Sequence, residues 1–187
     1  MKERTYYKKK EEMIELPYGK GKVKFNLPKG WECEVLRPEP VSPATDPFKE
    51  VFQSLENPLG EKRLEDFRGA ASVAIAISDE TRPIPYRFIL PPLLEKLNKM
   101  GISNPSVQIF IASGLHPPMP ESRFPNLLPA EIINRYSIKA HDATCSDLKF
   151  LGETSRRTPV FVNPLFDQAE LRLAIGLIDP HQFVGYT

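Results

Sequence analysis

The sequence is poor in cysteine and has no long apolar run. Its 187 residues include two cysteines, Cys33 and Cys145, which lie too far apart to form a metal-binding pair. Such sparse use of cysteine favours a reducing compartment, so we expect a cytoplasmic protein. No segment approaches the ~20 apolar residues of a membrane helix, and the amino-terminal stretch lacks the apolar centre of a signal peptide.

The sequence also lacks an excess of charge of either sign. Its 25 basic and 24 acidic residues give a net charge of +1, so there is no electrostatic reason to expect nucleic acid or an anionic membrane as a partner. A phosphate-binding loop, a G-x-G-x-x-G fingerprint and a G-x-S-x-G nucleophile elbow are all missing. Any chemistry therefore has to come from other residues.

What is present is an ordinary globular composition with an excess of proline. Hydrophobic residues make up 41% of the sequence and charged residues 26%. The length suits one domain, which we expect to span residues 1–187. The 20 prolines fall mostly at the ends of apolar runs, where they separate elements and stiffen loops.

An antiparallel hairpin is predicted near the start, within residues 15–38. Residues 20–28 place Val23, Phe25 and Leu27 at every second position, which is the period of a half-buried strand. Residues 31–38 are the expected partner strand, with the turn at Lys29 and Gly30.

Residues 45–187 are predicted to form an α/β core. A helix follows a cap at Thr45 or Asp46, and further helices are expected at 86–100 and 129–136. Continuously apolar runs at 72–78, 106–114 and 171–178 are typical of strands buried on both faces, and shorter strands are expected at 136–142 and 158–163. This alternation predicts a mainly parallel, Rossmann-like sheet with helices on both faces.

Polar residues follow the three buried strands, where ligands bind in open α/β sheets. They are Asp79, Glu80, Thr81 and Arg82 after the first strand, His116 after the second, and Asp179 and His181 after the third. If the sheet is parallel, these loops open on the same edge. Two histidines at that edge suggest an acid/base pair working near neutral pH.

Plainer interpretations compete with this one. The loop from Asp79 can be a simple turn in which Asp79 or Thr81 caps the next helix and Pro83 lies in its first turn, and its amides with Arg82 can also hold an anion. A single histidine after a strand is more often structural than catalytic, although glycine before His116 and two prolines after it fix the backbone that presents the ring. His141, beside Asp142, is better explained by packing.

Four segments in order resemble the amino-terminal domain of the nickel-dependent lactate racemase family. They are "SDETRPIP", "ASGLHPPM", "HDATCSDLKFLGETS" with "TPVFVNP", and "IDPHQFVGYT", and the resemblance runs from about Ala71 to Thr187. It implies a nickel-pincer nucleotide as cofactor and a 2-hydroxy acid as substrate, which loses hydride from Cα, becomes a planar 2-keto acid and regains hydride on the other face. It also implies that His116 and His181 act as the two acid/bases, that Asp79, Glu80, Thr81 and Arg82 bind the cofactor, and that Arg82 polarises the substrate.

The same resemblance implies a carboxyl-terminal domain after Thr187, with a lysine that attaches to the cofactor and a histidine that binds nickel. We therefore expect this chain alone to be inactive and to hold no nickel. Leu115 and Pro117 beside His116, and the pair Arg156 and Arg157, depart from the family pattern and leave the substrate open.

Two other functions stay open at this point. The first is a nucleotide- or anion-binding domain without chemistry, and the second is a metal hydrolase that uses His116, His141 and Asp142. The racemase interpretation predicts that His116 and His181 approach each other across a cleft, with Arg82 nearby.

Overall fold

The structure is a computed structural model that describes residues 13–31, 33, 41–181 and 185–186. The chain divides into two compact units, Met1–Thr45 and Asp46–Thr187. Both cysteines are free thiols. Among the described residues, no helix combines the length and the apolar character needed to cross a bilayer.

The first unit contains an antiparallel hairpin of β1 (Met13–Tyr18) and β2 (Gly21–Asn26). The strand expected at 20–28 therefore forms, and it pairs with the strand before it, which was not predicted. The turn lies at Gly19, whose φ of 55° suits glycine. Most of the expected partner at 31–38 lies outside the described residues.

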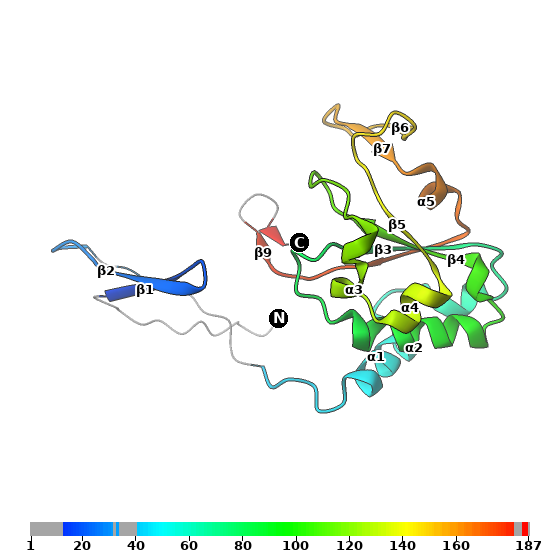
Figure 1. The fold of residues 1–187 in the computed structure, drawn as a ribbon, viewed down its shortest axis with the longest axis horizontal. Coiled ribbons are helices and arrows are strands. Elements are labelled where there is room, and N and C mark those ends of the chain that lie inside the picture. The colour runs from blue at the N-terminus through cyan, green and yellow to red at the C-terminus, as the bar shows by residue number, and fades with distance from the viewer. Residues whose placement is uncertain (1–12, 32, 34–40, 182–184, 187) are drawn as a thin grey trace. The chain divides into compact units, whose positions relative to one another are not determined.

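The second unit is built on a four-stranded parallel sheet of order β5-β4-β3-β8, which confirms the predicted fold class. Its strands are β3 (Val73–Ser78), β4 (Val107–Ala112), β5 (Ser137–Ala140) and β8 (Leu171–Ile175). Figure 1 shows the helices on both sides of this sheet. The central strands β3 and β4 are β-branched and apolar because both of their faces are covered.

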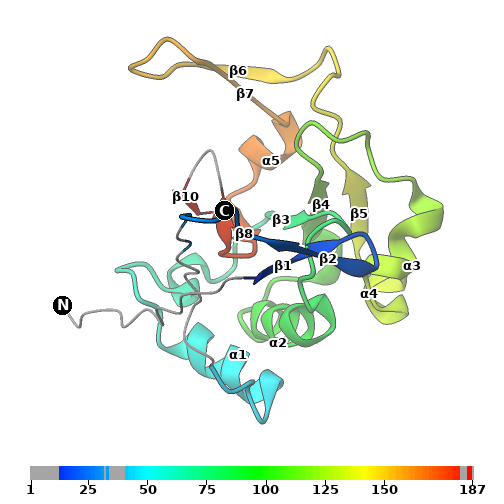
Figure 2. The same ribbon diagram turned by 90° about the vertical axis from the view of Figure 1, so that its left-hand side faces the viewer.

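One face of the sheet carries most of the helices and the main core. These helices are α1 (Pro47–Glu56), α2 (Tyr86–Lys99), α3 (Phe124–Leu127) and α4 (Ala130–Arg135), and they are seen from a second direction in Figure 2. Ile75 and Ile109 of the sheet and Leu90 of α2 are 0% exposed in this core. The other face is covered by the short helix α5 (Pro164–Gln168), where Phe166 meets Phe110 edge to face at 6.0 Å between ring centroids.

Several elements differ from the prediction. The strand expected at 158–163 forms as β7 (Pro159–Val162), but it pairs antiparallel with an unexpected strand, β6 (Lys149–Glu153), in a separate two-stranded sheet. The side chains of β6 are mostly exposed, and those of β7 alternate between exposed and half-buried. Neither pattern suits a strand buried inside the parallel sheet. The remaining short elements are η1 (Leu64–Phe67), η2 (Asn104–Ser106), η3 (Glu121–Arg123), β9 (Pro180–His181) and β10 (Gly185–Tyr186).

The strand order creates a switch point at β3. The chain moves from β3 to β4 on one side, and β8 lies against β3 on the other side. In sheets of this kind the connections diverge at such a point and leave a crevice at the carboxyl ends of the strands. The loops after β3, β4 and β8 are therefore the ones that position a site.

Candidate active site

The loop after β3 is an aspartate turn that does not cap a helix. Asp79 Oδ1 accepts hydrogen bonds from the Thr81 amide at 3.0 Å and from Thr81 Oγ1 at 2.5 Å. Helix α2 begins at Tyr86, and its cap position, Pro85, makes no side-chain capping bond. The interpretation of Asp79 or Thr81 as a helix cap, with Pro83 in the first turn, is therefore wrong.

His116 is presented by a tight turn at the end of β4. Its amide donates to the Ser113 carbonyl at 3.0 Å, and Gly114 between them has a φ of 60°, a conformation that favours glycine. His116 Nδ1 lies 2.8 Å from Asp79 Oδ2. The structure thus joins the loops after β3 and β4 through one hydrogen bond.

This contact links a buried carboxylate to an exposed ring. Asp79 is 7% exposed, whereas the His116 side chain is 58% exposed. Burial alone would raise the pKa of Asp79, but the hydrogen bonds from Thr81 and His116 outweigh it and hold the pKa of this carboxyl below its ordinary value. Asp79 is therefore ionised at neutral pH, and His116 has a nitrogen, Nε2, left to meet a ligand.

A second ion pair closes the other side of the loop. Arg123 of η3 donates to Glu80 Oε1. Together with Thr81, Met119 and the prolines of the 117–120 segment, the residues Asp79, Glu80, His116 and Arg123 line a hollow of about 280 Å³. Sequence reasoning missed Arg123, and the only signal for it was the proline-rich segment that leads the chain back toward the loop after β3.

Arg82 and His181 are placed at the same edge of the sheet but do not line this hollow. Arg82 follows the aspartate turn and its side chain is exposed. His181 lies in β9, beyond the carboxyl end of β8, and is half-buried opposite Gly185 of β10. Because β3 separates β4 from β8, their ends stand about two strand spacings, or roughly 10 Å, apart. The approach of the two histidine rings across a cleft stays a prediction.

His141 belongs to a different local arrangement. Its amide donates to the Ile111 carbonyl at 2.9 Å, and its Nδ1 lies 3.4 Å from Asn163 Nδ2. The neighbouring Asp142 forms its own turn with Thr144. Within the described ranges, no three His, Cys, Asp or Glu side chains gather as metal ligands, so the structure gives no support to a hydrolase that uses His116, His141 and Asp142.

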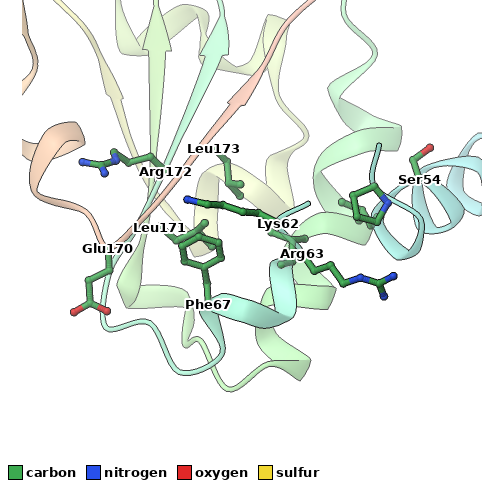
Figure 3. A pocket seen from close by; sticks show the side chains of 11 residues that line it. Ser54, Lys62, Arg63, Phe67, Glu170, Leu171, Arg172 and Leu173 are labelled. Carbon is green, nitrogen blue, oxygen red and sulfur yellow. The ribbon is translucent and has the colours of Figure 1, made fainter. Parts of the chain in front are cut away.

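A larger hollow, of about 410 Å³, lies between the first half of β8 and the segment from Ser54 to Phe67. Figure 3 shows Phe67, Leu171 and Leu173 among its lining side chains, with the charged Lys62 and Arg63. The lining part of β8 is its amino-terminal half, whereas the candidate site lies beyond the carboxyl ends of the strands. This hollow is therefore not part of the candidate site.

Comparison with known proteins gives a consistent result. Residues 18–187 match the family model of the lactate racemase N-terminal domain. The chain is 34% identical over 178 residues to a lactate racemase of Thermoanaerobacterium thermosaccharolyticum, covering 93% of this chain and 42% of that protein. It is 31% identical over 139 residues to a lactate racemase of Lactiplantibacillus plantarum, covering 73% and 32%.

A solved structure is similar as well. The lactate racemase apoprotein from Thermoanaerobacterium thermosaccharolyticum superimposes with a TM-score of 0.75 at 31% identity, covering 94% of this chain and 41% of that one. The chain thus spans less than half the length of the relatives it matches.

Proposed function

This chain belongs to the lactate racemase N-terminal domain family, and from that premise we propose that it is the amino-terminal domain of a 2-hydroxy acid racemase. His116 and His181 are the acid/base groups, one for each enantiomer. The observation that carries the proposal is the 2.8 Å contact between His116 Nδ1 and the buried Asp79 carboxylate, made where the loops after two parallel strands meet.

The reaction inverts one carbon, Cα, of the substrate. A 2-hydroxy acid that loses hydride from Cα and a proton from its hydroxyl becomes a planar 2-keto acid, and their return on the opposite face gives the other enantiomer. When bound, a nickel-pincer nucleotide would supply the hydride acceptor and donor for this reaction. His116 takes or returns the hydroxyl proton for one enantiomer and His181 does so for the other.

The residues of the loop after β3 fit the nucleotide part of such a cofactor. The charge of Glu80 is paired with Arg123, which reduces its repulsion of a phosphate, and both oxygens of Asp79 already accept hydrogen bonds within the site. The exposed Arg82 is available for an anionic group. Glu80, Thr81 and Arg82 would hold the nucleotide, at a switch point of the kind that binds nucleotides in related folds.

Nickel would be held with help from elsewhere, because the family resemblance assigns the nickel histidine and the anchoring lysine to a carboxyl-terminal domain. We therefore propose that domain as the partner of this one. The absence of racemase activity from this chain alone and a cytoplasmic location both stay predictions.

Replacing each histidine in the complete, cofactor-loaded protein tests this function. His116→Ala and His181→Ala should each lower racemisation in both directions by a factor of about 100 to 10,000, because every full turnover needs both bases. His141→Ala is the matched control and should leave the rate unchanged, since the His141 ring contacts Asn163.

Single-turnover absorbance with one pure enantiomer separates catalysis from binding. Each variant should keep cofactor reduction with the enantiomer whose base remains and lose it with the other. Equal loss with both enantiomers in both variants would make the histidines binding groups, and the alternative of a non-catalytic nucleotide- or anion-binding domain would then be favoured.

A further inference from the structure

We propose that Asp79 is a positioning residue that places the ring proton of neutral His116 on Nδ1, and that Thr81 determines which oxygen of Asp79 does so. The resemblance to the family assigned Asp79 to the cofactor; the geometry assigns it to the histidine. The link to catalysis rests on the proposed function, whereas the position of the proton does not.

The two oxygens of Asp79 have different partners. Oδ1 accepts both hydrogen bonds of Thr81, from the amide at 3.0 Å and from Oγ1 at 2.5 Å. Oδ2 faces His116 Nδ1 at 2.8 Å. An ionised carboxylate can only accept hydrogen bonds, so the neutral ring has to carry its proton on Nδ1. Nε2 is then unprotonated and can accept a proton from a substrate hydroxyl.

Packing alone does not fix this ring. The His116 side chain is 58% exposed, so few neighbours restrict its rotation or its tautomer. Asp79, in contrast, is 7% exposed and is held by two hydrogen bonds of its own. The buried, held partner therefore orients the exposed one.

The geometry makes a sharp prediction for Asp79→Asn. The Thr81 amide can only donate and lies 3.0 Å from Oδ1, so the asparagine should place its carbonyl oxygen there, because an NH₂ group would face that amide. The Thr81 hydroxyl, which can donate or accept, can keep donating to this oxygen as it does to Oδ1. The NH₂ group then faces His116 Nδ1 and donates to it. Nδ1 becomes an acceptor and the ring proton moves to Nε2, the nitrogen needed as base.

The chain contains a matched control for this substitution. Asp142 Oδ1 accepts from the Thr144 amide at 2.8 Å and from Thr144 Oγ1 at 2.6 Å, which repeats the turn of Asp79 and Thr81. The ring of the adjacent His141 contacts Asn163. Asp142→Asn thus alters the same kind of turn and leaves His116 with its partner.

The first experiment measures the proton position by NMR in the 187-residue chain. Only three histidines contribute, so two-bond proton–nitrogen correlations of the ¹⁵N-labelled rings can be assigned with His116→Gln. At a pH of about 9, where histidine is ordinarily neutral, wild-type His116 should be protonated on Nδ1, as should His116 in Asp142→Asn. In Asp79→Asn it should be protonated on Nε2.

A wild-type ring protonated mainly on Nε2 would overturn the proposal, and this result does not depend on whether Asp79→Asn folds. A folded Asp79→Asn variant in which His116 keeps its proton on Nδ1 would overturn the role given to Thr81.

The second experiment connects the proton position to the reaction in the complete, cofactor-loaded protein. Asp79→Asn should slow cofactor reduction by the enantiomer that depends on His116, by a factor of up to about 10,000, which is the loss caused by tautomer inversion in a serine-protease triad. Reduction by the other enantiomer should change little. If the NMR result holds but Asp79→Asn slows both enantiomers equally or neither, the proton position stands and the enantiomer-specific role of His116 fails.

Discussion

The position of the His116 ring depends on its sequence neighbours and on one distant residue, Asp79. The glycine before the histidine and the prolines after it are visible in the sequence, and they predict a fixed backbone at this point. The contact with Asp79, at 2.8 Å, joins residues 37 positions apart. No local spacing encodes that contact, because it depends on β3 and β4 lying side by side in register.

At the residue scale, Gly114→Ala should destabilise the fold. Gly114 has a φ of 60°, and nothing lies within 4 Å of an added Cβ, so the cost is conformational, about 1 kcal/mol. Gly60→Ala is the control, because Gly60 has the same open surroundings without a positive φ, and it should be neutral or slightly stabilising. Urea unfolding monitored by circular dichroism measures both. Equal stability of the two variants would mean that the turn before His116 does not need glycine.

At the scale of elements, Lys96 joins three helical segments. Its Nζ lies 2.8 Å from Glu56 of α1 and 2.7 Å from Glu65 of η1, and it donates to the Leu55 carbonyl at 3.1 Å. Lys96 itself belongs to α2 and is 5% exposed. This buried ammonium was invisible in the sequence, where it is one lysine among many on a helix.

Lys96→Met should therefore lower the free energy of unfolding by more than the same replacement of an exposed lysine does. We expect a loss of about 1.5 kcal/mol or more, because hydrogen bonds to charged groups are lost while methionine fills the space of the stem. Lys99→Met is the control. Its pair with Glu95 has a side-chain exposure of 68% on the lysine, and such pairs contribute about 0.3–0.5 kcal/mol. Similar losses in the two variants would contradict the structural role of Lys96.

The same cluster predicts a pH dependence. The hydrogen bond from Lys96 holds the pKa of Glu65 below its ordinary value of 4.5. Burial alone would lower the pKa of Lys96, but its hydrogen bonds to Glu56 and Glu65 raise it above 10.5. Because the carboxyl pKa is lowered, the stabilisation it gives is fully present above pH 4.5 and is lost as the pH falls through the lowered pKa. Because the lysine pKa is raised, the stabilisation it gives is fully present below pH 10.5 and is lost as the pH rises through the raised pKa.

The stability difference between wild type and Lys96→Met should thus be constant between these two values and shrink as the pH falls below 4.5. Urea unfolding at a series of pH values measures it. A difference that persists at pH 3 or grows there would show that packing, and not the ion pairs, accounts for the effect of Lys96.

At the scale of the whole molecule, the sequence predicted what depends on local periodicity. The apolar runs that became β3, β4 and β8 and the capped helix α1 were identified because burial on both faces, or a cap at Asp46, leaves a local pattern. The pairing partner of β2 and the separate sheet of β6 and β7 were missed, because pairing is decided by contacts between segments. The loop residues could be located because they follow the apolar strands directly in the sequence. The contact between Asp79 and His116 could not be predicted in this way, because it depends on the register of β3 and β4.

Among the described residues, the core of the second unit is built from side chains of that unit. All members of the main buried cluster lie between Val73 and Leu171, and the partly buried residues that pack on it begin at Leu55. The site residues Asp79, His116 and Arg123 also belong to this unit.

We therefore expect a chain that begins at residue 43, and so keeps the Asp46 cap of α1, to fold by itself. Its melting temperature should lie within a few degrees of that of the 187-residue chain, and the neutral His116 ring should still carry its proton on Nδ1, as measured by the same NMR correlations. A matched chain that begins at residue 58 removes α1 with Glu56 and Leu55, two partners of Lys96, and should melt clearly lower. A loss of cooperative unfolding in the chain that begins at residue 43 would mean that the parallel sheet depends on the amino-terminal unit.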